Sequence, residues 1–254
     1  MKFYLGCLAL VLLICSCQTK SAEDTLSKST STQHIVLFLD KSASFGLDTA
    51  FITQKYQEQI RLLLQSHIQK AGDRIEVFYV HDNTLKGKCL DLVAKTPQVD
   101  TQTLNPTDVE SAQLDFDLQI GKERLKFEKK ILEVLHLPNA DLSNQMTDLG
   151  ATLSLLNERN TGDVSLTSYY FSDMLESTRN GLNFHKKKPT TPEEAKSWAT
   201  GEAEKYKDIN LQGVAIIMIL PFNPMTNSKK NDPYITLFWT TLFENLGALS
   251  VEEL

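Results

Sequence analysis

The stretch His34-Ile-Val-Leu-Phe-Leu-Asp40 is a continuous apolar run of β-forming residues that ends in an acid. An unbroken run of this kind is typical of a strand that is buried on both faces of a parallel sheet. Strand-like and helix-like segments alternate along the rest of the chain. This alternation predicts an α/β fold: a Rossmann-like, doubly wound, mostly parallel central sheet flanked by helices. Ligands of such folds bind at the carboxyl ends of the strands.

The other expected elements follow from the spacing of apolar residues. Apolar residues that recur three and four positions apart predict helices at 48–69, 109–135, 149–156, 192–206 and 233–246. Runs of β-forming residues predict further strands at 74–80, 164–173 and 211–220, with a possible short strand at 89–93. Segment 114–120 also alternates like a strand. A helix is favoured there because good helix formers continue the apolar stripe through 122–135.

The composition bounds the class of protein. The 254 residues include 26 Lys and Arg against 32 Asp and Glu, which gives a net charge of −6. A nucleic-acid-binding domain usually carries a basic excess, so no nucleic-acid partner is expected. Hydrophobic residues make up 41% and charged residues 23%, as in an average globular protein. One well-packed domain is therefore the natural prediction.

The N-terminus has the pattern of a secretion signal. Lys2 precedes the apolar run Leu5 to Ile14, which is too short to span a bilayer. The following Ile14-Cys15-Ser16-Cys17 resembles the lipobox of bacterial lipoproteins. That resemblance implies a signal peptide at 1–16 and lipidation of Cys17, because cleavage before Cys15 would place Ile14 where lipoboxes carry a small residue. A plain secretion signal and a buried apolar strand are the alternatives.

Residues 17–32 are expected to form a solvated tether, because they are rich in Ser, Thr and Lys. Gln18 follows the lipidated cysteine. By resemblance to enterobacterial sorting, the lack of Asp at this position favours the outer over the inner membrane of a bacterial cell envelope. Cys89 is the cysteine left in the body of the chain, so a structural disulfide is not expected, and a lone thiol of this kind is more often packed than catalytic.

Oxygen-bearing side chains follow three predicted elements. Asp40, Ser42 and Ser44 alternate directly after the first strand, Thr147 opens a predicted helix, and Asp173 ends a predicted strand. Such groups meet at the carboxyl edge of a parallel sheet. Hard cations such as Mg²⁺ prefer oxygen ligands.

At these residues the chain resembles the von Willebrand factor type A (VWA) domain. That family builds a metal-ion-dependent adhesion site from an Asp-x-Ser-x-Ser loop, a Thr from a second loop and an Asp after a later strand. The resemblance covers 33–249, with an insertion within 82–145 because Asp40 and Thr147 lie far apart. Two features depart from the family pattern: Met174 stands where Gly is usual, and Thr152 competes with Thr147 as the hydroxyl donor.

The resemblance implies that Mg²⁺, or Mn²⁺ or Ca²⁺, is bound by Asp40, Ser42, Ser44, Thr147 and Asp173. It also implies that an acidic residue of a partner protein completes the coordination. A binding protein rather than an enzyme is expected, because the histidines at 34, 67, 81, 136 and 185 are scattered and none pairs with a nucleophile.

Three alternatives stay open. The fold could be a metal-free scaffold of an envelope complex. Less favoured is a metal-dependent hydrolase subunit, because no further acids cluster for a second metal. Ser42 or Ser44 could also simply cap a helix, with Asp173 as a turn residue.

Overall fold

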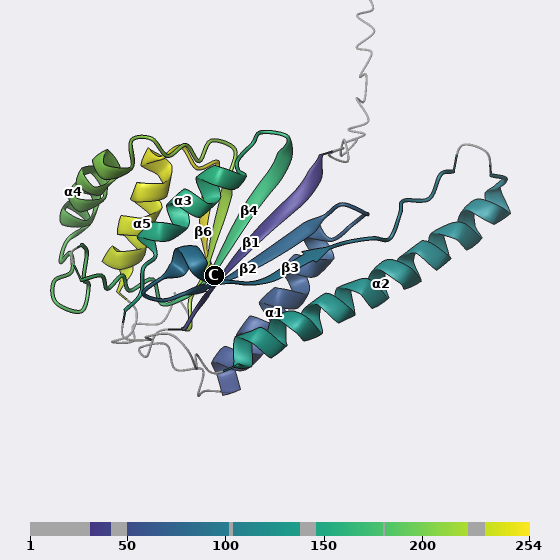
Figure 1. Ribbon diagram of the computed structural model, residues 1–254, viewed down its shortest axis with the longest axis horizontal. Coiled ribbons are helices and arrows are strands. Elements are labelled where there is room, and N and C mark those ends of the chain that lie inside the picture. Colours follow the sequence, from purple (N-terminus) through teal and green to yellow (C-terminus); the bar gives the residue numbers. More distant parts are fainter. Residues whose placement is uncertain (1–30, 42–49, 102–103, 138–145, 180, 223–231) are drawn as a thin grey trace, which may run out of the picture. The chain divides into compact units, whose positions relative to one another are not determined.

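Six strands form a mostly parallel sheet in the order β3-β2-β1-β4-β5-β6 (Figure 1). The strands are β1 (Thr32–Asp40), β2 (Arg74–Val80), β3 (Lys88–Val93), β4 (Val164–Phe171), β5 (Ala215–Ile219) and β6 (Ser250–Glu253). Strand β3 pairs antiparallel with β2, and the remaining pairs are parallel. The predicted α/β fold with a mostly parallel sheet is confirmed.

This computed structural model describes residues 31–41, 50–101, 104–137, 146–179, 181–222 and 232–254. Ser31–Leu254 form one compact unit, which contains two apolar cores. Cys17, Ser42 and Ser44 lie outside the described residues, as does the signal segment. Within the described ranges, no helix combines the length and the apolarity needed to cross a bilayer.

Helices cover both faces of the sheet because β1 is apolar on both sides. Ile35, Leu37 and Leu39 pack with α1 (Ala50–His67) and α2 (Pro106–His136). Val36 and Phe38 belong to the core that contains residues of α3 (Gly150–Arg159) and α5 (Pro233–Asn245). Helix α4 (Pro192–Ala203) joins this second core, and two short 3₁₀ helices, η1 (Thr84–Lys86) and η2 (Glu204–Tyr206), complete the set.

The strand order reverses between β1 and β4. Strand β1 pairs with β2 on one side and with β4 on the other, and Leu39 lies opposite Phe171. From this pair of strands the sheet extends through β2 to β3 on one side and through β5 to β6 on the other. In open α/β sheets the crevice at such a reversal is where ligands bind, beyond the carboxyl ends of the strands. Asp40 ends β1 at this edge.

Two predicted elements differ in extent or type from the observed ones by more than a few residues at their ends, and one observed strand was not predicted. The strand expected at 211–220 covers only Ala215–Ile219, because Gly213 has a φ of 84° and interrupts the run. The helix expected at 192–206 is α4 followed by η2, and it is not fully exposed, since Ala195 and Ala199 are buried. Strand β6 was not expected, because Ser250-Val-Glu-Glu253 is short, mostly polar and at the sheet edge.

Candidate functional site

Asp40 is held in place by a hydroxyl that the sequence pattern did not single out. Its side chain is buried at the end of β1, and its Oδ2 accepts a hydrogen bond from Ser172 Oγ at 2.7 Å. Ser172 follows β4, and its Oγ accepts in turn from the backbone N–H of Met174 at 2.9 Å. The pairing of β1 with β4 therefore fixes the orientation of the Asp40 carboxylate.

Asp173 and Met174 form a tight turn directly after Ser172. Asp173 Oδ1 accepts from the backbone N–H of Leu175 at 3.0 Å. Met174 has a φ of 61°, a left-handed conformation that is uncommon for residues other than glycine. Its carbonyl accepts from Trp239 Nε1 at 2.8 Å, and its side chain is buried. Packing against α5 thus holds a conformation that Gly would adopt without strain.

The structure brings Asp40 and Asp173 to one place, beside Tyr56 of α1. The Tyr56 hydroxyl donates to the carbonyl of Ile219 at 3.2 Å. Burial first, and then the negative charges of Asp40 and Asp173, raise the pKa of Tyr56 well above its usual value. Both carboxylates therefore lie within electrostatic reach of the same buried side chain, at the carboxyl edge of the sheet.

Thr147 lies in the loop that leads into α3. Ser177 donates its backbone N–H to the Thr147 carbonyl at 2.9 Å, and Ser177 Oγ accepts from the Thr147 N–H at 3.0 Å. The next residue, Asp148, donates its N–H to the carbonyl of His81 beyond the end of β2. In the part of the chain that the structure describes, the buried Thr147 Oγ1 has no hydrogen-bond partner.

The hydroxyl of Thr152, the alternative to Thr147, already has two hydrogen-bond partners. Its Oγ1 donates to the carbonyl of Leu149 and shares a hydrogen bond of 2.8 Å with the hydroxyl of Tyr170. Both groups are buried beneath α3. A buried hydroxyl with two good partners gains nothing from a further ligand, whereas an unpaired one leaves a desolvation cost uncompensated. Of the two, Thr147 is the better candidate to meet a ligand.

His81 was not predicted to matter, although it directly follows β2 at the same edge. It is buried, and its Nδ1 accepts from the backbone N–H of Asn83 at 2.9 Å. The Asp82 carboxylate lies 3.4 Å from the same nitrogen, and Nε2 has no hydrogen-bond partner in the described part of the chain. Burial lowers the pKa of His81 and favours its neutral form. The His81 carbonyl has a positioning role, because it accepts from the backbone N–H of Asp148, the residue after Thr147.

Glu176 is a second residue that sequence reasoning missed. Its Oε2 accepts from the backbone N–H groups of Leu149 at 2.6 Å and Gly150 at 3.3 Å, at the start of α3. Burial first, and then the charge of Asp148, raise the pKa of Glu176 to about 8. Glu176 fixes the segment that carries Thr147, and no local motif marks it because its partners are backbone groups 26 and 27 residues away.

The raised pKa of Glu176 predicts a pH-dependent stability. The folded protein binds this proton more tightly than the unfolded chain, so stability falls as pH rises from about 4.5 to about 8. Glu176→Gln keeps the acceptor oxygen and cannot ionise. We expect the variant, in EDTA, to lose much of this fall, a change on the order of a few kcal/mol at pH 8. Urea unfolding at several pH values measures the free energy of unfolding of both proteins. If it falls equally with pH in parent and variant, Glu176 is not the group responsible.

The neighbouring lysine does not neutralise the site. Lys41 follows Asp40, and its ammonium group donates to the carbonyls of Leu135 and Leu137, the latter at 2.8 Å, at the end of α2. It also lies 5.1 Å from the centre of the Tyr79 ring. Burial lowers the pKa of Lys41 to about 8. Lys41 therefore anchors the end of α2, where a cation is favourable for the helix dipole.

Two observations limit the chemistry of the described residues. No three His, Cys, Asp or Glu side chains in the described ranges are grouped so that they could hold a metal ion. Cys89 is a free, half-buried thiol whose Sγ lies 3.4 Å from the carbonyl of Val77, and burial raises its pKa to about 11. A thiol with so high a pKa is a poor nucleophile.

Comparison with known proteins adds little to this geometry. No protein-family model and no curated protein matches the sequence. Among solved structures, proximal thread matrix protein 1 from the mussel byssus is similar at 12% identity and a TM-score of 0.37, over 87% of this chain and 43% of that one. A structure of the same mussel protein with a zinc-occupied MIDAS motif is similar at 14% identity and a TM-score of 0.31, over 88% and 42%. This chain spans less than half of those chains, and likeness at these values establishes no shared function.

Proposed function

We propose that residues 33–249 form a VWA-type domain that binds a divalent cation at the carboxyl edge of the sheet and, through it, a protein partner. The observation that carries the proposal is the buried hydroxyl of Thr147, which has no hydrogen-bond partner among the residues that the structure describes. It lies at the same sheet edge as the carboxylates of Asp40 and Asp173, which follow the two strands where the order reverses.

The donors available there suit a hard cation. Asp40 and Asp173 offer carboxylate oxygens, and Thr147 offers a hydroxyl. Ser42 and Ser44, outside the described residues, are expected to add two more hydroxyls. Oxygen-only ligands favour Mg²⁺, Mn²⁺ or Ca²⁺ over softer metals. A bound cation would supply the partner for Thr147 Oγ1 that the described protein atoms do not provide.

The partner proposal follows from charge. Hydroxyl ligands add no charge, and a carboxylate that reaches the cation through water offsets its charge less strongly than one that binds it directly. A Glu or Asp of another protein would therefore be attracted to a remaining coordination position. The resemblance of Ile14-Cys15-Ser16-Cys17 to a lipobox supports a further part of the proposal: the protein is anchored through Cys17 to the bacterial cell envelope, in the outer rather than the inner membrane, and captures its partner there.

A metal-free scaffold is the second candidate, because each described site residue also has a structural task. Asp40 accepts a hydrogen bond from Ser172, which joins the ends of β1 and β4. Asp173 stabilises a turn, and the Thr147 backbone pairs with Ser177. The two functions differ in one respect. A scaffold has no use for an unpaired Thr147 hydroxyl, whereas a cation site does.

The two threonines provide a matched test. Thr147→Val removes the unpaired hydroxyl, so without cation the variant should be more stable than the parent by about 1–3 kcal/mol. In Mg²⁺ and Mn²⁺ titrations of residues 21–254 by calorimetry and thermal shift, it should bind about 10- to 100-fold more weakly. Thr152→Val should lose about 1 kcal/mol and keep cation binding. Absence of binding in the parent would leave the scaffold function.

A further inference from the structure

The first half of α2 has little support from the rest of the described chain: Phe116 packs against the core beside α1, but it is only half-buried. Helix α2 runs for 31 residues, and its buried residues begin only at Ile120. Residues 106–119 thus form about four helical turns without one buried side chain. Isolated helices of this length are marginal in water, because most helical stability in proteins comes from packing. A contact beyond this chain would supply the missing packing.

The same helix carries an exposed leucine stripe. Leu114, Leu118 and Leu125 are 65%, 57% and 66% exposed, and they recur at intervals of four and seven. Half-buried Leu132 continues the interval of seven. Spacings of three, four and seven place side chains on one helical face, as in the seam of a coiled coil.

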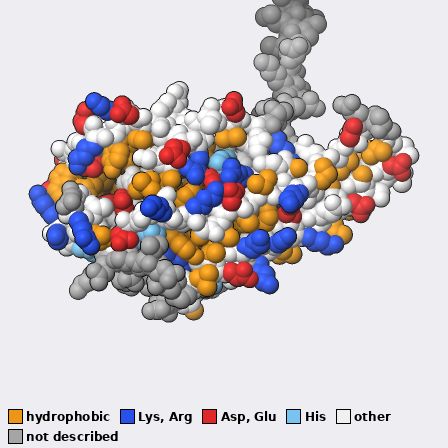
Figure 2. All heavy atoms as spheres, viewed as in Figure 1, with side chains coloured by type: hydrophobic (Ala, Val, Ile, Leu, Met, Phe, Trp, Pro, Cys, Tyr) orange, Lys and Arg blue, Asp and Glu red, His pale blue; other side chains and the backbone are white. Residues whose placement is uncertain are grey.

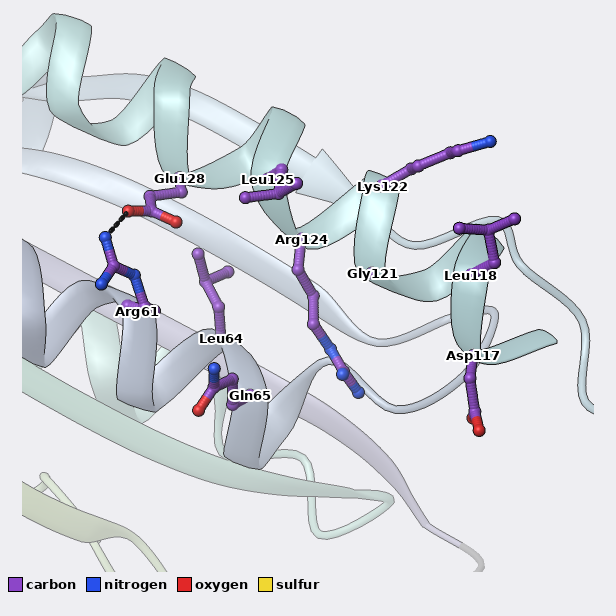
Figure 3. Close-up of a pocket in the computed structure, with 10 residues that line it drawn as sticks. All are labelled: Arg61, Leu64, Gln65, Asp117, Leu118, Gly121, Lys122, Arg124, Leu125 and Glu128. Atoms are coloured by element: carbon purple, nitrogen blue, oxygen red, sulfur yellow. Dashed lines mark hydrogen bonds and ion pairs between the residues drawn. The ribbon is translucent and has the colours of Figure 1, made fainter. Parts of the chain in front are cut away.

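A groove between α1 and α2 adjoins this stripe. Leu64 of α1 and Leu118 and Leu125 of α2 line a hollow of about 380 Å³. Figure 3 shows Leu64 pointing from α1 toward α2. A second hollow of about 620 Å³ continues past Leu125 and Leu132 to His136. Arg61 and Glu128, paired at 3.1 Å, lie where the two hollows meet. The groove is apolar enough to take the side chains of a second helix.

Charge along α2 indicates which helix fits. Its first half, 106–121, carries four acids and no base, namely Asp108, Glu110, Asp115 and Asp117. Its second half carries five bases against three acids, namely Lys122, Arg124, Lys126, Lys129 and Lys130 against Glu123, Glu128 and Glu133. Figure 2 shows acidic side chains (red) toward one end of α2 and basic side chains (blue) farther along the helix. When two copies of such a helix run antiparallel, the acidic half of each copy lies beside the basic half of the other.

Gly121 lies at the centre of the stripe. A helix-interior glycine costs about 1 kcal/mol relative to alanine, and a Cβ at Gly121 would meet no described atom within 4 Å. The packing of this chain therefore does not require glycine there. The close approach of a second helix would require a residue without a side chain at this position.

We propose that two copies of this chain pair through α2 in antiparallel orientation, each placing its leucine stripe in the α1–α2 groove of the other. With Gly121 near the crossing, Leu118 lies opposite Gly121 of the second copy and Leu125 lies opposite its Leu114. In this register Asp115 lies two positions from direct opposition to Lys122 of the second copy, on the same side of the helix pair, where long charged side chains that flank an apolar seam can pair. The tether at 17–32 is not a suitable occupant, because its apolar residues are only Ala22 and Leu26, besides Cys17.

Sedimentation of residues 21–254 over a concentration series tests the pairing. The mass of the parent should double as concentration rises. Leu118→Lys with Leu125→Lys should remain a monomer, with an unchanged fold by circular dichroism because both side chains are exposed. Leu249→Lys, at a leucine 71% exposed outside α2, should dimerise like the parent. A parent that stays monomeric, or a double variant that still dimerises, overturns the proposal.

Charge reversal tests the orientation without touching the leucines. Asp115→Lys alone and Lys122→Asp alone should each weaken dimerisation about 3- to 10-fold, and the two together should restore it. The residues are seven positions apart on their own helix, too far for a direct intrahelical pair, so restoration reports the contact between copies. If the double variant is the weakest of the three, the antiparallel register is wrong.

Discussion

Replacing Glu76 with Ala is expected to destabilise the fold by about 3–5 kcal/mol. Glu76 is 2% exposed on β2, at the sheet end opposite the candidate site, and side chains from three other elements contact its carboxylate. His34 of β1 lies 3.0 Å from it, and Arg159 of α3 and Lys88 of β3 both donate to it. Truncation leaves the mostly buried guanidinium of Arg159 without its buried counter-charge and with only the exposed carboxylate of Glu158 nearby.

The neighbouring Glu158 is the matched control. It contacts the same guanidinium at 3.6 Å, but its side chain is 68% exposed. Glu158→Ala should therefore change stability by no more than about 0.5 kcal/mol. Urea unfolding of the three proteins measures both effects. Similar losses for the two variants would mean that the Glu76 cluster contributes no more than a surface ion pair.

The same cluster predicts the response to acid. Burial alone would raise the pKa of Glu76, but hydrogen bonds from His34, Arg159 and Lys88 hold it well below its usual value. A carboxyl with a depressed pKa adds stability that is complete above about pH 4.5 and is lost as pH falls toward the folded pKa. The stability of Glu76→Gln should depend less on pH below 4.5.

Asp40→Asn is expected to weaken cation binding by more than about 100-fold while changing stability little. The asparagine side chain has nearly the same shape, and its amide oxygen can still accept from Ser172 Oγ. What it removes is the negative charge, one of the two carboxylates proposed to hold the cation. Calorimetric titration with Mg²⁺ and Mn²⁺, beside thermal unfolding in EDTA, separates the two effects.

The exposed Asp163, before β4, is the control for loss of charge. Asp163→Asn should bind the cation like the parent. If Asp40→Asn binds as tightly as the parent, the carboxylate serves only to align β1 with β4. If it unfolds at much lower temperature without cation, the charge itself is structural.

Much of the fold could be predicted because its apolar periodicity is regular. Ile35–Leu39 is buried on both faces of the sheet, as its unbroken apolar run indicates. The helical spacing also favoured a helix over the ambiguous segment 114–120, which lies within α2. Strand β6 escaped prediction because pairing with β5, not its own mostly polar sequence, makes it a strand.

The sequence singled out candidate site residues only where they stand at the end of a predicted strand, as Asp40 and Asp173 do, or at the start of a predicted helix, as Thr147 does. Asp40 and Asp173 meet because β1 and β4 are adjacent and parallel, which the alternation of elements allows. Ser172, His81 and Glu176 contribute through contacts with residues far away in sequence, so no local pattern marks them. Met174 appeared only as a departure from the family pattern, and its left-handed φ shows that the backbone turn does not depend on glycine.

The most direct test of the cation site is a crystal structure of residues 21–254 grown with Mn²⁺, with anomalous scattering used to locate the metal. The account predicts one strong anomalous peak at the carboxyl edge of the sheet, within coordination distance of Thr147 Oγ1 and of a carboxylate of Asp40 or Asp173, directly or through one water. A well-ordered site without a peak, or a peak elsewhere with Thr147 Oγ1 bonded to protein, would contradict it.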